Sequence, residues 1–212
     1  MKKPKQLSYI AVDGPIGAGK TTLVQMLAKD LGGQFILEPV EKNPFLPEFY
    51  KNKDKNAFKT QLFFLLNRFQ QQKEIKALGE QLVVCDYTFA KDAIFANMNL
   101  SSEEQKLYNT IYELLHATLP QPDLVIYLKA DANVMLERIK SRGYDYEKSI
   151  KASYLEKLTE AYNQHFLNYN DSPLLVVDST AVNYQANPQD FAQLKREIAN
   201  HRGGTAFLIA RS

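Results

Sequence analysis

The sequence feature that most constrains this chain is the glycine-rich segment 14–21, which reads GPIGAGKT and fits the pattern G-x-x-x-x-G-K-[ST] at every fixed position. It follows the apolar run Tyr9–Asp13, which we predict to be a buried strand, and it opens Lys20–Leu31, where leucines recur at helical spacing. Such glycines let backbone N–H groups face phosphate oxygens, and a helix N-terminus favours anions. The segment therefore predicts a nucleotide-binding site.

The pattern also assigns roles within the loop. We expect Lys20 to reach the outer phosphates and the Thr21 hydroxyl to bind Mg²⁺. The expected nucleotide-binding residues of the loop are Gly14, Pro15, Ile16, Gly17, Ala18, Gly19, Lys20, Thr21 and Thr22. The motif alone does not distinguish a kinase from a GTPase or an ATPase.

Short apolar runs alternate with helical patterns along the rest of the chain. We predict further strands at 35–38, 81–86, 124–129 and 174–178, and helices at 43–50, 58–76, 90–98, 102–118, 133–141, 149–169 and 188–200. This alternation predicts an α/β fold with a five-stranded parallel sheet and helices on both faces. We expect one domain over 1–200; residues 201–212 are a tail that is either loose or an added edge strand.

Composition excludes several classes of protein. The 26 basic and 24 acidic residues nearly cancel, so binding of nucleic acid through bulk charge is not expected. One cysteine permits no intramolecular disulfide and no cysteine-rich metal site. No apolar stretch approaches the length of a membrane helix, and no secretory signal is evident. We expect a small-molecule enzyme of the cytoplasm, with no nucleic-acid or membrane partner.

Two acidic residues stand at predicted strand ends. Glu38 ends the second strand and Asp86 the third, at the edge of the sheet where the glycine-rich loop also lies. A carboxylate there either holds Mg²⁺ or accepts a proton from an attacking hydroxyl. Each could instead be a solvated acid at a strand terminus, but two acids beside one phosphate loop favour a functional role.

Two further pairs are ambiguous from spacing alone. Gln61 and Arg68 are seven residues apart on the helix 58–76 and form either one wall of a pocket or the edge of an apolar arc. Arg138 and Arg142 are four apart at a helix end before Gly143. They either stabilise phosphates during transfer or complement the helix dipole as an ordinary basic last turn.

Several blocks together resemble the deoxynucleoside kinase family, and the bacterial deoxyguanosine and deoxyadenosine kinases within it. The blocks are the loop at 14–22, EPVEKNPFLPEFY at 38–50, QLFFLLNR at 61–68, DYTFAKD at 86–92, and LERIKSRG at 136–143 with its continuation to Glu147. Their spacings agree as well, and the resemblance extends over about residues 9–178.

The resemblance implies a role for each matched residue. Glu38 is similar to the base that takes the proton of the substrate's 5′-hydroxyl, with Lys20 and Arg142 as its catalytic partners. Tyr50 and Glu147 match the pair that binds the 3′-hydroxyl, and Gln61, Arg68 and Asp92 match the groups that read the base. Arg138 and Arg142 match arginines that close on ATP, in a lid that the resemblance places at about 138–150 of a phosphate-loop kinase fold. Asp86 matches an acid near Mg²⁺, and Asp86 with Tyr87 borders the substrate.

Two positions depart from the family pattern. Tyr87 stands where an arginine often follows the acid of the third strand, and Tyr144 replaces the second arginine of a frequent Arg-Gly-Arg in the lid. We interpret Tyr87 as a trait of this branch and not as inactivation. The Tyr144 change implies that one phosphate or adenine contact is weaker or supplied elsewhere.

The resemblance implies ATP- and Mg²⁺-dependent phosphorylation of a 2′-deoxynucleoside at its 5′-hydroxyl, in deoxynucleotide salvage, by a homodimer. A purine deoxynucleoside is favoured, with deoxycytidine as the other candidate. Two alternatives stay open: a nucleoside monophosphate kinase of the thymidylate kinase type, and a non-catalytic nucleotide-binding member of the family. The first would need cationic groups for an acceptor phosphate near Glu38, where Lys42 is the nearest candidate.

Overall fold

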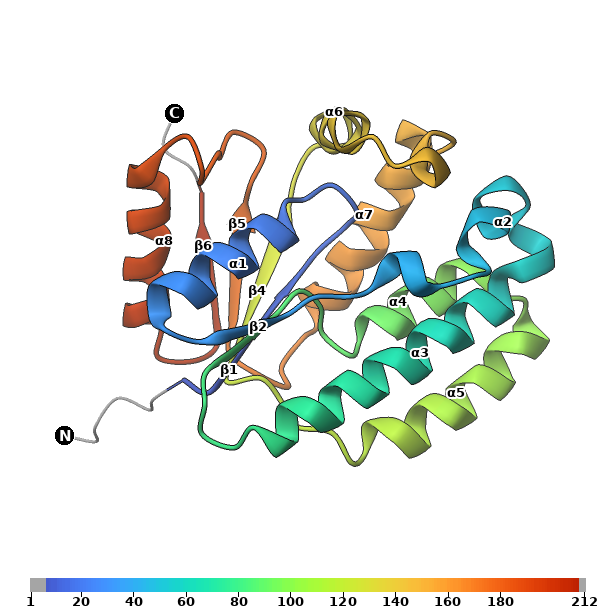
Figure 1. The fold of residues 1–212 in the computed structure, drawn as a ribbon, viewed down its shortest axis with the longest axis horizontal. Helices are drawn as coiled ribbons and strands as arrows, with labels where there is room; N and C mark the ends of the chain where they lie inside the picture. Colours follow the sequence, from blue (N-terminus) through green and yellow to red (C-terminus); the bar gives the residue numbers. More distant parts are fainter. Residues whose placement is uncertain (1–6, 210–212) are drawn as a thin grey trace.

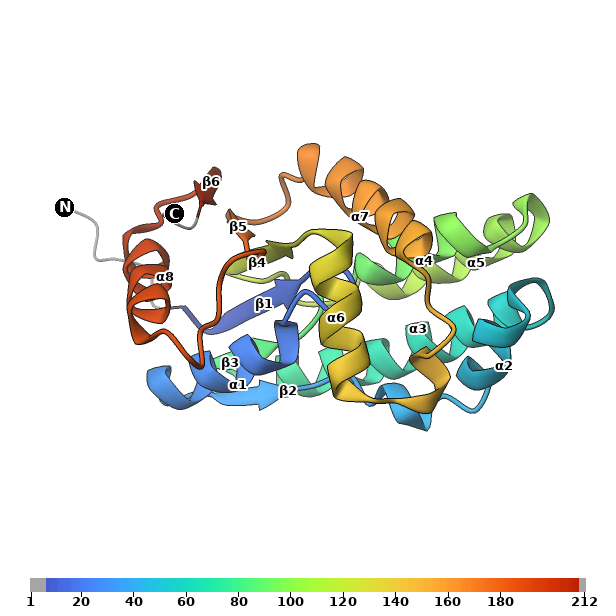
Figure 2. The ribbon, with the colours of Figure 1, turned by 90° about the horizontal axis from the view of Figure 1, so that it is seen from above.

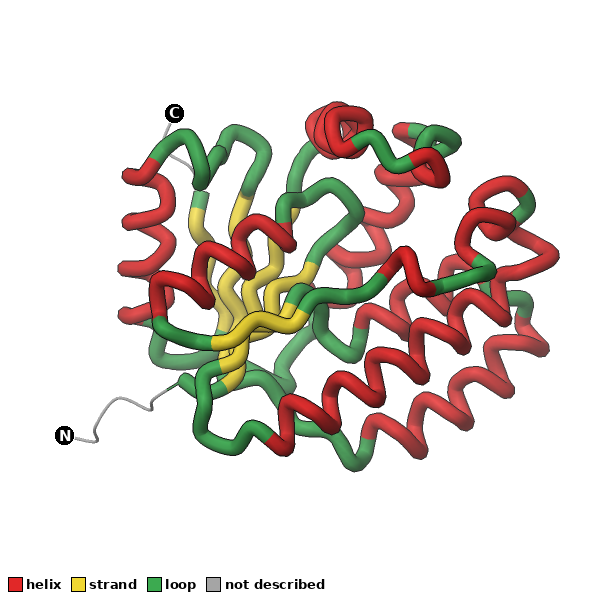
Figure 3. Tube along the Cα trace, viewed as in Figure 1, coloured by secondary structure: helices red, strands yellow, loops and turns green. Residues whose placement is uncertain are grey.

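The computed structural model of the chain describes residues 7–209, which form one parallel sheet between two layers of helices (Figure 1). The strands are β1 (Tyr9–Asp13), β2 (Gln34–Ile36), β3 (Val83–Cys85), β4 (Leu124–Lys129), β5 (Leu174–Asp178) and β6 (Thr205–Leu208). Their order is β2-β3-β1-β4-β5-β6, and each neighbouring pair is parallel. The tube in Figure 3 shows the strands gathered between the red helices.

The helices lie close to the predicted ranges. They are α1 (Lys20–Leu31), α2 (Leu46–Lys51), α3 (Lys53–Ala77), α4 (Lys91–Asn99), α5 (Ser102–His116), α6 (Ala132–Arg142), α7 (Ala152–Leu167) and α8 (Pro188–Asn200), with 3-10 turns at Val40–Lys42 and Asp145–Glu147. A capping box of Ser101 and Glu104 starts α5. α7 begins at Ala152, three residues later than predicted, because the chain is not yet helical between the second 3-10 turn and this residue.

Each strand sends alternate side chains to opposite faces of the sheet. Ile10 and Val12 pack with the apolar residues of α1, α6 and α8. Tyr9 and Ala11 pack on the other face, with side chains from α3, α4 and α7. In Figure 2, α1 and α7 accordingly lie on opposite sides of the strands. Because both faces are covered, the central strands β1 and β4 are apolar up to their last residues, Asp13 and Lys129.

The expectation of five strands is wrong, because the structure has a sixth. β6 pairs in parallel with β5, with Thr205 opposite Leu174, and Leu208 is buried in the same core as α8. The run was apolar and of strand length, but its pairing depends on the open edge of β5, which no local pattern records. Residues 210–212 of the predicted tail lie outside the described residues.

The order of the strands creates a crevice at their carboxyl ends. From β1 the chain passes to β2 and β3 on one side and to β4, β5 and β6 on the other, so the connections diverge on either side of β1. Ligands of open α/β sheets bind at such a point. The glycine-rich loop follows β1, and Asp86 follows β3 directly, so both lie there. Within residues 7–209, no helix is long and apolar enough to cross a membrane.

Candidate active site

The glycine-rich loop is shaped by glycines that no other residue could replace without strain. Gly14 has a φ of 149°, and a Cβ there would lie 2.2 Å from the Leu128 carbonyl oxygen of β4. Gly19, with a φ of 99°, stands immediately before α1. The Lys20 ammonium folds back over the loop and donates to the carbonyl oxygens of Gly14 at 2.8 Å and Pro15 at 2.9 Å. The loop therefore presents a helix N-terminus and a cation to one space.

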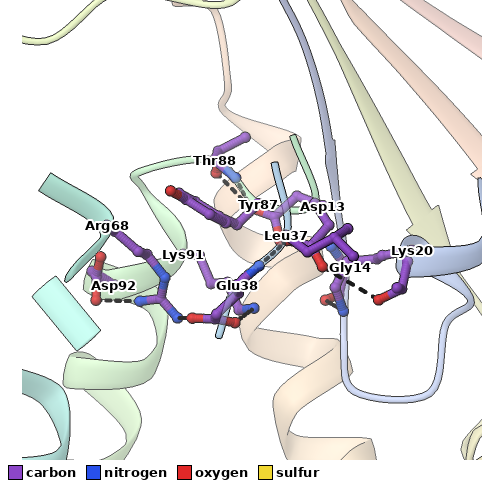
Figure 4. A network of polar contacts seen from close by, with 12 residues as sticks. Asp13, Gly14, Lys20, Leu37, Glu38, Arg68, Tyr87, Thr88, Lys91 and Asp92 are labelled. Atoms are coloured by element: carbon purple, nitrogen blue, oxygen red, sulfur yellow. Dashed lines mark hydrogen bonds and ion pairs between the residues drawn. The ribbon is translucent and has the colours of Figure 1, made fainter. Parts of the chain in front are cut away.

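A buried carboxylate, Asp13, anchors this loop to the rest of the site (Figure 4). It accepts hydrogen bonds from the Gly14 amide at 2.7 Å, from the Thr88 amide at 2.9 Å and hydroxyl at 2.5 Å, and from the Tyr162 hydroxyl of α7 at 3.0 Å. A buried carboxylate is stable only with such partners. Asp13 thus holds the end of β1, the segment after β3 and α7 in one arrangement.

Asp86 connects the loop to the second strand end. One of its oxygens accepts from the Glu38 amide at 2.8 Å, and the other accepts from the Thr21 hydroxyl at 3.3 Å. Burial raises the pKa of Asp86, while Lys91 opposes that shift. A hydroxyl and a carboxylate side by side at a phosphate loop fit Mg²⁺, which commonly takes one or two protein oxygens together with nucleotide phosphates and water.

Glu38 is held between two cations. Two residues beyond the end of β2, its carboxylate accepts from the Arg68 guanidinium on one oxygen and from the Lys91 ammonium, 2.6 Å away, on the other. Figure 4 shows the carboxylate between these two side chains. Burial acts to raise the pKa of Glu38, but Arg68 and Lys91 outweigh it and lower the pKa to about 2. Glu38 is therefore an ionised carboxylate at neutral pH.

Arg68 connects the Glu38 carboxylate to the interior of the site. Its guanidinium, from the middle of α3, also forms an ion pair with the fully buried Asp92 of α4 and lies 5.6 Å from the centre of the Tyr87 ring. Burial raises the pKa of Asp92 to about 7, against the opposing effect of Arg68. The Tyr87 hydroxyl turns away and donates to Gln71 at 2.9 Å. Arg68 is thus fixed from several sides and does not extend to solvent.

A cavity of about 400 Å³ opens beside Glu38, a volume that suits a small organic ligand. Predicted residues on its wall are Ile16, Gly17, Lys20, Thr21, Glu38, Tyr50, Gln61, Arg68, Asp86, Arg142 and Glu147. Gln61 is buried, and its side-chain oxygen has no hydrogen-bond partner among the residues that the structure describes. A buried acceptor without a partner is costly, so this amide is suited to a polar ligand.

A second cavity, of about 670 Å³, lies on the other side of the loop. Its wall includes the predicted residues Gly17, Ala18, Gly19, Lys20, Thr21, Thr22, Arg138 and Arg142, and it also includes residues 179–185, which follow β5. Arg138 donates to the backbone oxygens of Ser179 at 2.8 Å and Ala18 at 3.4 Å. In this structure Arg138 therefore ties the segment after β5 to the phosphate loop.

Arg142 stands between the two cavities and lines both. It pairs with Glu147, whose carboxylate is 2.5 Å from Nη2. The rings of Tyr50, Tyr146 and Tyr144 form a stack beside this pair, with centroids 6.3 and 5.4 Å apart, and the Arg142 guanidinium lies 5.0 Å from the Tyr144 ring centre. Tyr144, where an arginine was expected, thus supports Arg142.

Four predicted residues line neither cavity. Gly14 and Pro15 form the base of the loop, and Tyr87 and Asp92 lie behind Arg68. Sequence reasoning missed Asp13, Lys91 and the segment 179–185. The rule that chemistry follows strand ends would have pointed to Asp13 and 179–185. Lys91 carried one signal, a lysine in the first turn of the helix predicted at 90–98, where cations are disfavoured.

A parallel sheet with a phosphate loop after β1, and two cavities that meet at that loop, defines a phosphate-loop kinase of the nucleoside and nucleotide type. Within this class, residues 10–202 match the deoxynucleoside kinase family, and the chain belongs to that family. It is 37% identical over 197 residues to the deoxyguanosine kinase of Bacillus subtilis strain 168, an alignment that covers 90% of this chain and 95% of that protein.

Other relatives are named as kinases of a different deoxynucleoside. The chain is 33% identical over 207 residues to a deoxyadenosine kinase of Lactobacillus acidophilus, covering 91% of this chain and 95% of that one. Among solved structures it is similar to deoxyadenosine kinase from M. mycoides with the products dCMP and a flexible dCDP bound. That match has a TM-score of 0.77 and 31% identity, and it covers 89% of this chain and 98% of that one. Family membership therefore leaves the preferred base to be determined.

Proposed function

We propose that this protein transfers the terminal phosphoryl group of ATP to the 5′-hydroxyl of a 2′-deoxynucleoside, preferentially a purine deoxynucleoside, in deoxynucleotide salvage. The observation that carries this proposal is the position of the ionised Glu38 carboxylate, on the wall of the 400 Å³ cavity that also holds Lys20 and Thr21 of the phosphate loop. A hydroxyl bound in that cavity would have a proton acceptor on one side and the phosphate loop on the other.

In phosphoryl transfer the protein contributes mainly by positioning the reactants and by stabilising negative charge. Phosphoryl transfer passes through a loose transition state, so a carboxylate of low pKa suffices to take the proton as the new bond forms. Lys20, with Arg142 at the junction of the cavities, would offset charge on the transferred group. Mg²⁺ would be held by Thr21 and Asp86, where it would offset phosphate charge.

The side chains of the smaller cavity support a nucleoside as the phosphate acceptor. Gln61 offers an amide oxygen without a partner among the described residues, and Arg68, held by its ion pair with Asp92, lines the same cavity. Tyr50 and Glu147 stand together at the cavity as the proposed contacts of the 3′-hydroxyl. The second cavity, with Arg138 and residues 179–185, would take the nucleotide of the donor.

We further propose a homodimer in the cytoplasm. The packed helices α3 and α5 expose large apolar side chains, with Leu66 50%, Leu107 55% and Leu114 72% accessible. Exposed apolar side chains on two helices that pack together suggest a surface that a second copy covers. The cytoplasm is supported by the single, buried thiol of Cys85 and by the supply of ATP there. Sedimentation of wild-type and Leu114→Lys protein would test the dimer, because a charge at that face should yield a monomer.

The function is tested by assaying the purified chain with ATP and Mg²⁺ against the four deoxynucleosides and their four monophosphates. Turnover of a purine deoxynucleoside, and little of any monophosphate, is expected. Glu38→Gln should lower kcat about 1,000-fold and leave ATP binding intact. Glu48→Gln, at an exposed carboxylate of α2, is the matched control. Wild-type protein that turns over only monophosphates, or nothing, would contradict the proposal, as would full activity in Glu38→Gln.

A further inference from the structure

We propose that Lys91 is a second cation of the phosphoryl-transfer site, one that holds Glu38 in the free protein and binds the transferring phosphoryl group during reaction. The inference rests on the proposed function and adds to it a catalytic residue that neither the glycine-rich motif nor the matched family blocks assigned to a role. Lys91 is buried at the start of α4, it contacts Glu38, and the arginine expected at position 87 is absent.

The position of Lys91 runs against local preference. It is the first residue of α4, where the helix dipole disfavours a cation, and its side chain is only 9% exposed. A lysine is seldom buried without a partner, since removing its charge from water is costly. Departures from local rules that the surroundings must offset are typical of functional sites. Lys91 is therefore unlike a surface lysine that merely stabilises a helix.

Lys91 has one hydrogen-bond partner among the residues that the structure describes, Glu38, at 2.6 Å. Arg68, the other cation on Glu38, is held more firmly because it also pairs with Asp92 and lies over the rings of Phe64 and Tyr87. A substrate hydroxyl that is to give its proton to Glu38 has to hydrogen-bond to this carboxylate, where it competes with the two cations already bonded there. Since Lys91 has fewer bonds to lose, its ammonium is the group that would move.

The groups around Lys91 indicate where its ammonium would move when it leaves Glu38. It lines the 400 Å³ cavity together with Lys20, Thr21 and Asp86. Its charge opposes protonation of Lys20 and favours ionisation of Asp86, which places it in electrostatic contact with the phosphate loop and with the proposed Mg²⁺ ligand. Lys91 is thus bonded to the proposed proton acceptor and lines the same cavity as Lys20 and Thr21 of the phosphate loop, where we propose that phosphoryl transfer occurs.

The residue at position 87 leaves room for this role. The arginine expected after Asp86 is absent, and Tyr87 is fully buried with its hydroxyl on Gln71, so it directs no charge into the cavity. Lys91 lies four residues further along the chain and brings a cation to the same strand end. The family pattern is therefore altered at this point while a positive charge at the cavity is preserved.

In the reaction, Lys91 would act as a cation and would neither give nor take the transferred proton. The hydroxyl oxygen of the substrate forms a bond to the terminal phosphorus of ATP as the bond from that phosphorus to the bridging oxygen of ADP breaks. The hydroxyl proton passes to Glu38. The Lys91 ammonium, displaced from Glu38 by the hydroxyl, donates to an oxygen of the phosphoryl group in transfer and offsets its charge.

The test compares Lys91→Met, Lys91→Arg and the exposed control Lys29→Met in steady-state assays with the best deoxynucleoside found for the wild type. Lys91→Met should lower kcat about 100-fold, with KM for both substrates changed only a few-fold, because the cation acts on the transition state. Lys91→Arg should recover part of the loss. Loss of the cation should also raise the pKa of Glu38 and move the acid limb of the kcat profile to higher pH.

A double variant separates catalysis from support of Glu38. Glu38→Gln with Lys91→Met leaves no unpaired charge from this ion pair, so it should fold even if Lys91→Met alone does not. A cation that acts on the phosphoryl group predicts a kcat about 10-fold or more below that of Glu38→Gln alone; equal values would overturn the proposal. So would a Lys91→Met kcat within threefold of wild type. Wild-type protein without activity would instead refute the proposed function, and this inference with it.

Discussion

Arg142 at the end of α6 donates two hydrogen bonds to Glu147 in the following 3-10 turn, one from Nε at 3.2 Å and one from Nη2 at 2.5 Å. The arginine lines both cavities, and the carboxylate is nearly buried at the wall of the smaller one. A residue proposed to act on the phosphate donor is therefore bonded to one proposed to read the deoxyribose. A ligand bound in one cavity should therefore change the affinity of the other cavity for its ligand through this pair.

Glu147→Gln should expose that coupling. The loss of charge removes the ion pair with Arg142 and weakens the proposed contact with the 3′-hydroxyl, so KM for the deoxynucleoside should rise about 10-fold. The affinity for ATP should change as well, although Glu147 does not line the larger cavity. Asp145→Asn, at an exposed carboxylate in the same turn, should leave both values as in wild type. An unchanged ATP affinity in Glu147→Gln would contradict the coupling.

Gln61 should contribute to binding without contributing to stability. Its buried oxygen has no partner among the described residues, so Gln61→Leu should keep the free energy of unfolding within about 1 kcal/mol or raise it, while deoxynucleoside binding weakens about 30-fold. Gln72 on the same helix is a matched control. Its amide already exchanges hydrogen bonds with the Tyr9 hydroxyl, so Gln72→Leu should lower stability by about 1–2 kcal/mol and retain binding. Denaturant titration and calorimetry would measure both; the reverse pattern would refute the assignment.

Asp13 should be a structural anchor of the site. Its carboxylate accepts from Gly14, from Thr88 twice and from Tyr162, so Asp13→Ala would leave four buried donors without their acceptor. We expect a loss of about 3 kcal/mol or more in the free energy of unfolding, measured in urea. Asp30→Ala, at a partly exposed ion pair with Lys195, should cost less than about 1 kcal/mol. Comparable losses in the two variants would refute the anchoring role.

ATP binding should weaken at alkaline pH. Burial, assisted by the nearby charge of Lys91, lowers the pKa of Lys20 to about 8. Below that pH the ammonium is protonated and attracts phosphate; as pH rises through 8 the free protein loses the proton, and binding must restore it. ATP affinity should therefore fall by up to about tenfold per pH unit above 8, with proton uptake on binding. Calorimetry in buffers of different ionisation enthalpy would detect the proton. Lys20→Arg, which stays charged, should show neither effect.

The sequence by itself determined the features that depend on neighbours along the chain. The phosphate loop, the α/β alternation and the bounds of α1, β4, β5 and α8 all agree with the predicted ranges, because glycine conformation, helical spacing and apolar runs record local geometry and burial. The acids Glu38 and Asp86 could be placed at one edge of the sheet because parallel strands bring their carboxyl ends together.

Only the tertiary structure decided which of these groups meet. The run after Gly204 became a sixth strand because β5 offered it an open edge. Glu38 lies between Arg68 and Lys91 because α3 and α4, which carry these two cations, pack against each other. The spacing of residues on α3 is compatible with Arg68 in a pocket or in solvent. Its burial in an ion pair with Asp92 places it in the pocket. Ion pairs between segments distant in sequence leave no periodic trace along it, since their energy arises only when folding removes both partners from water.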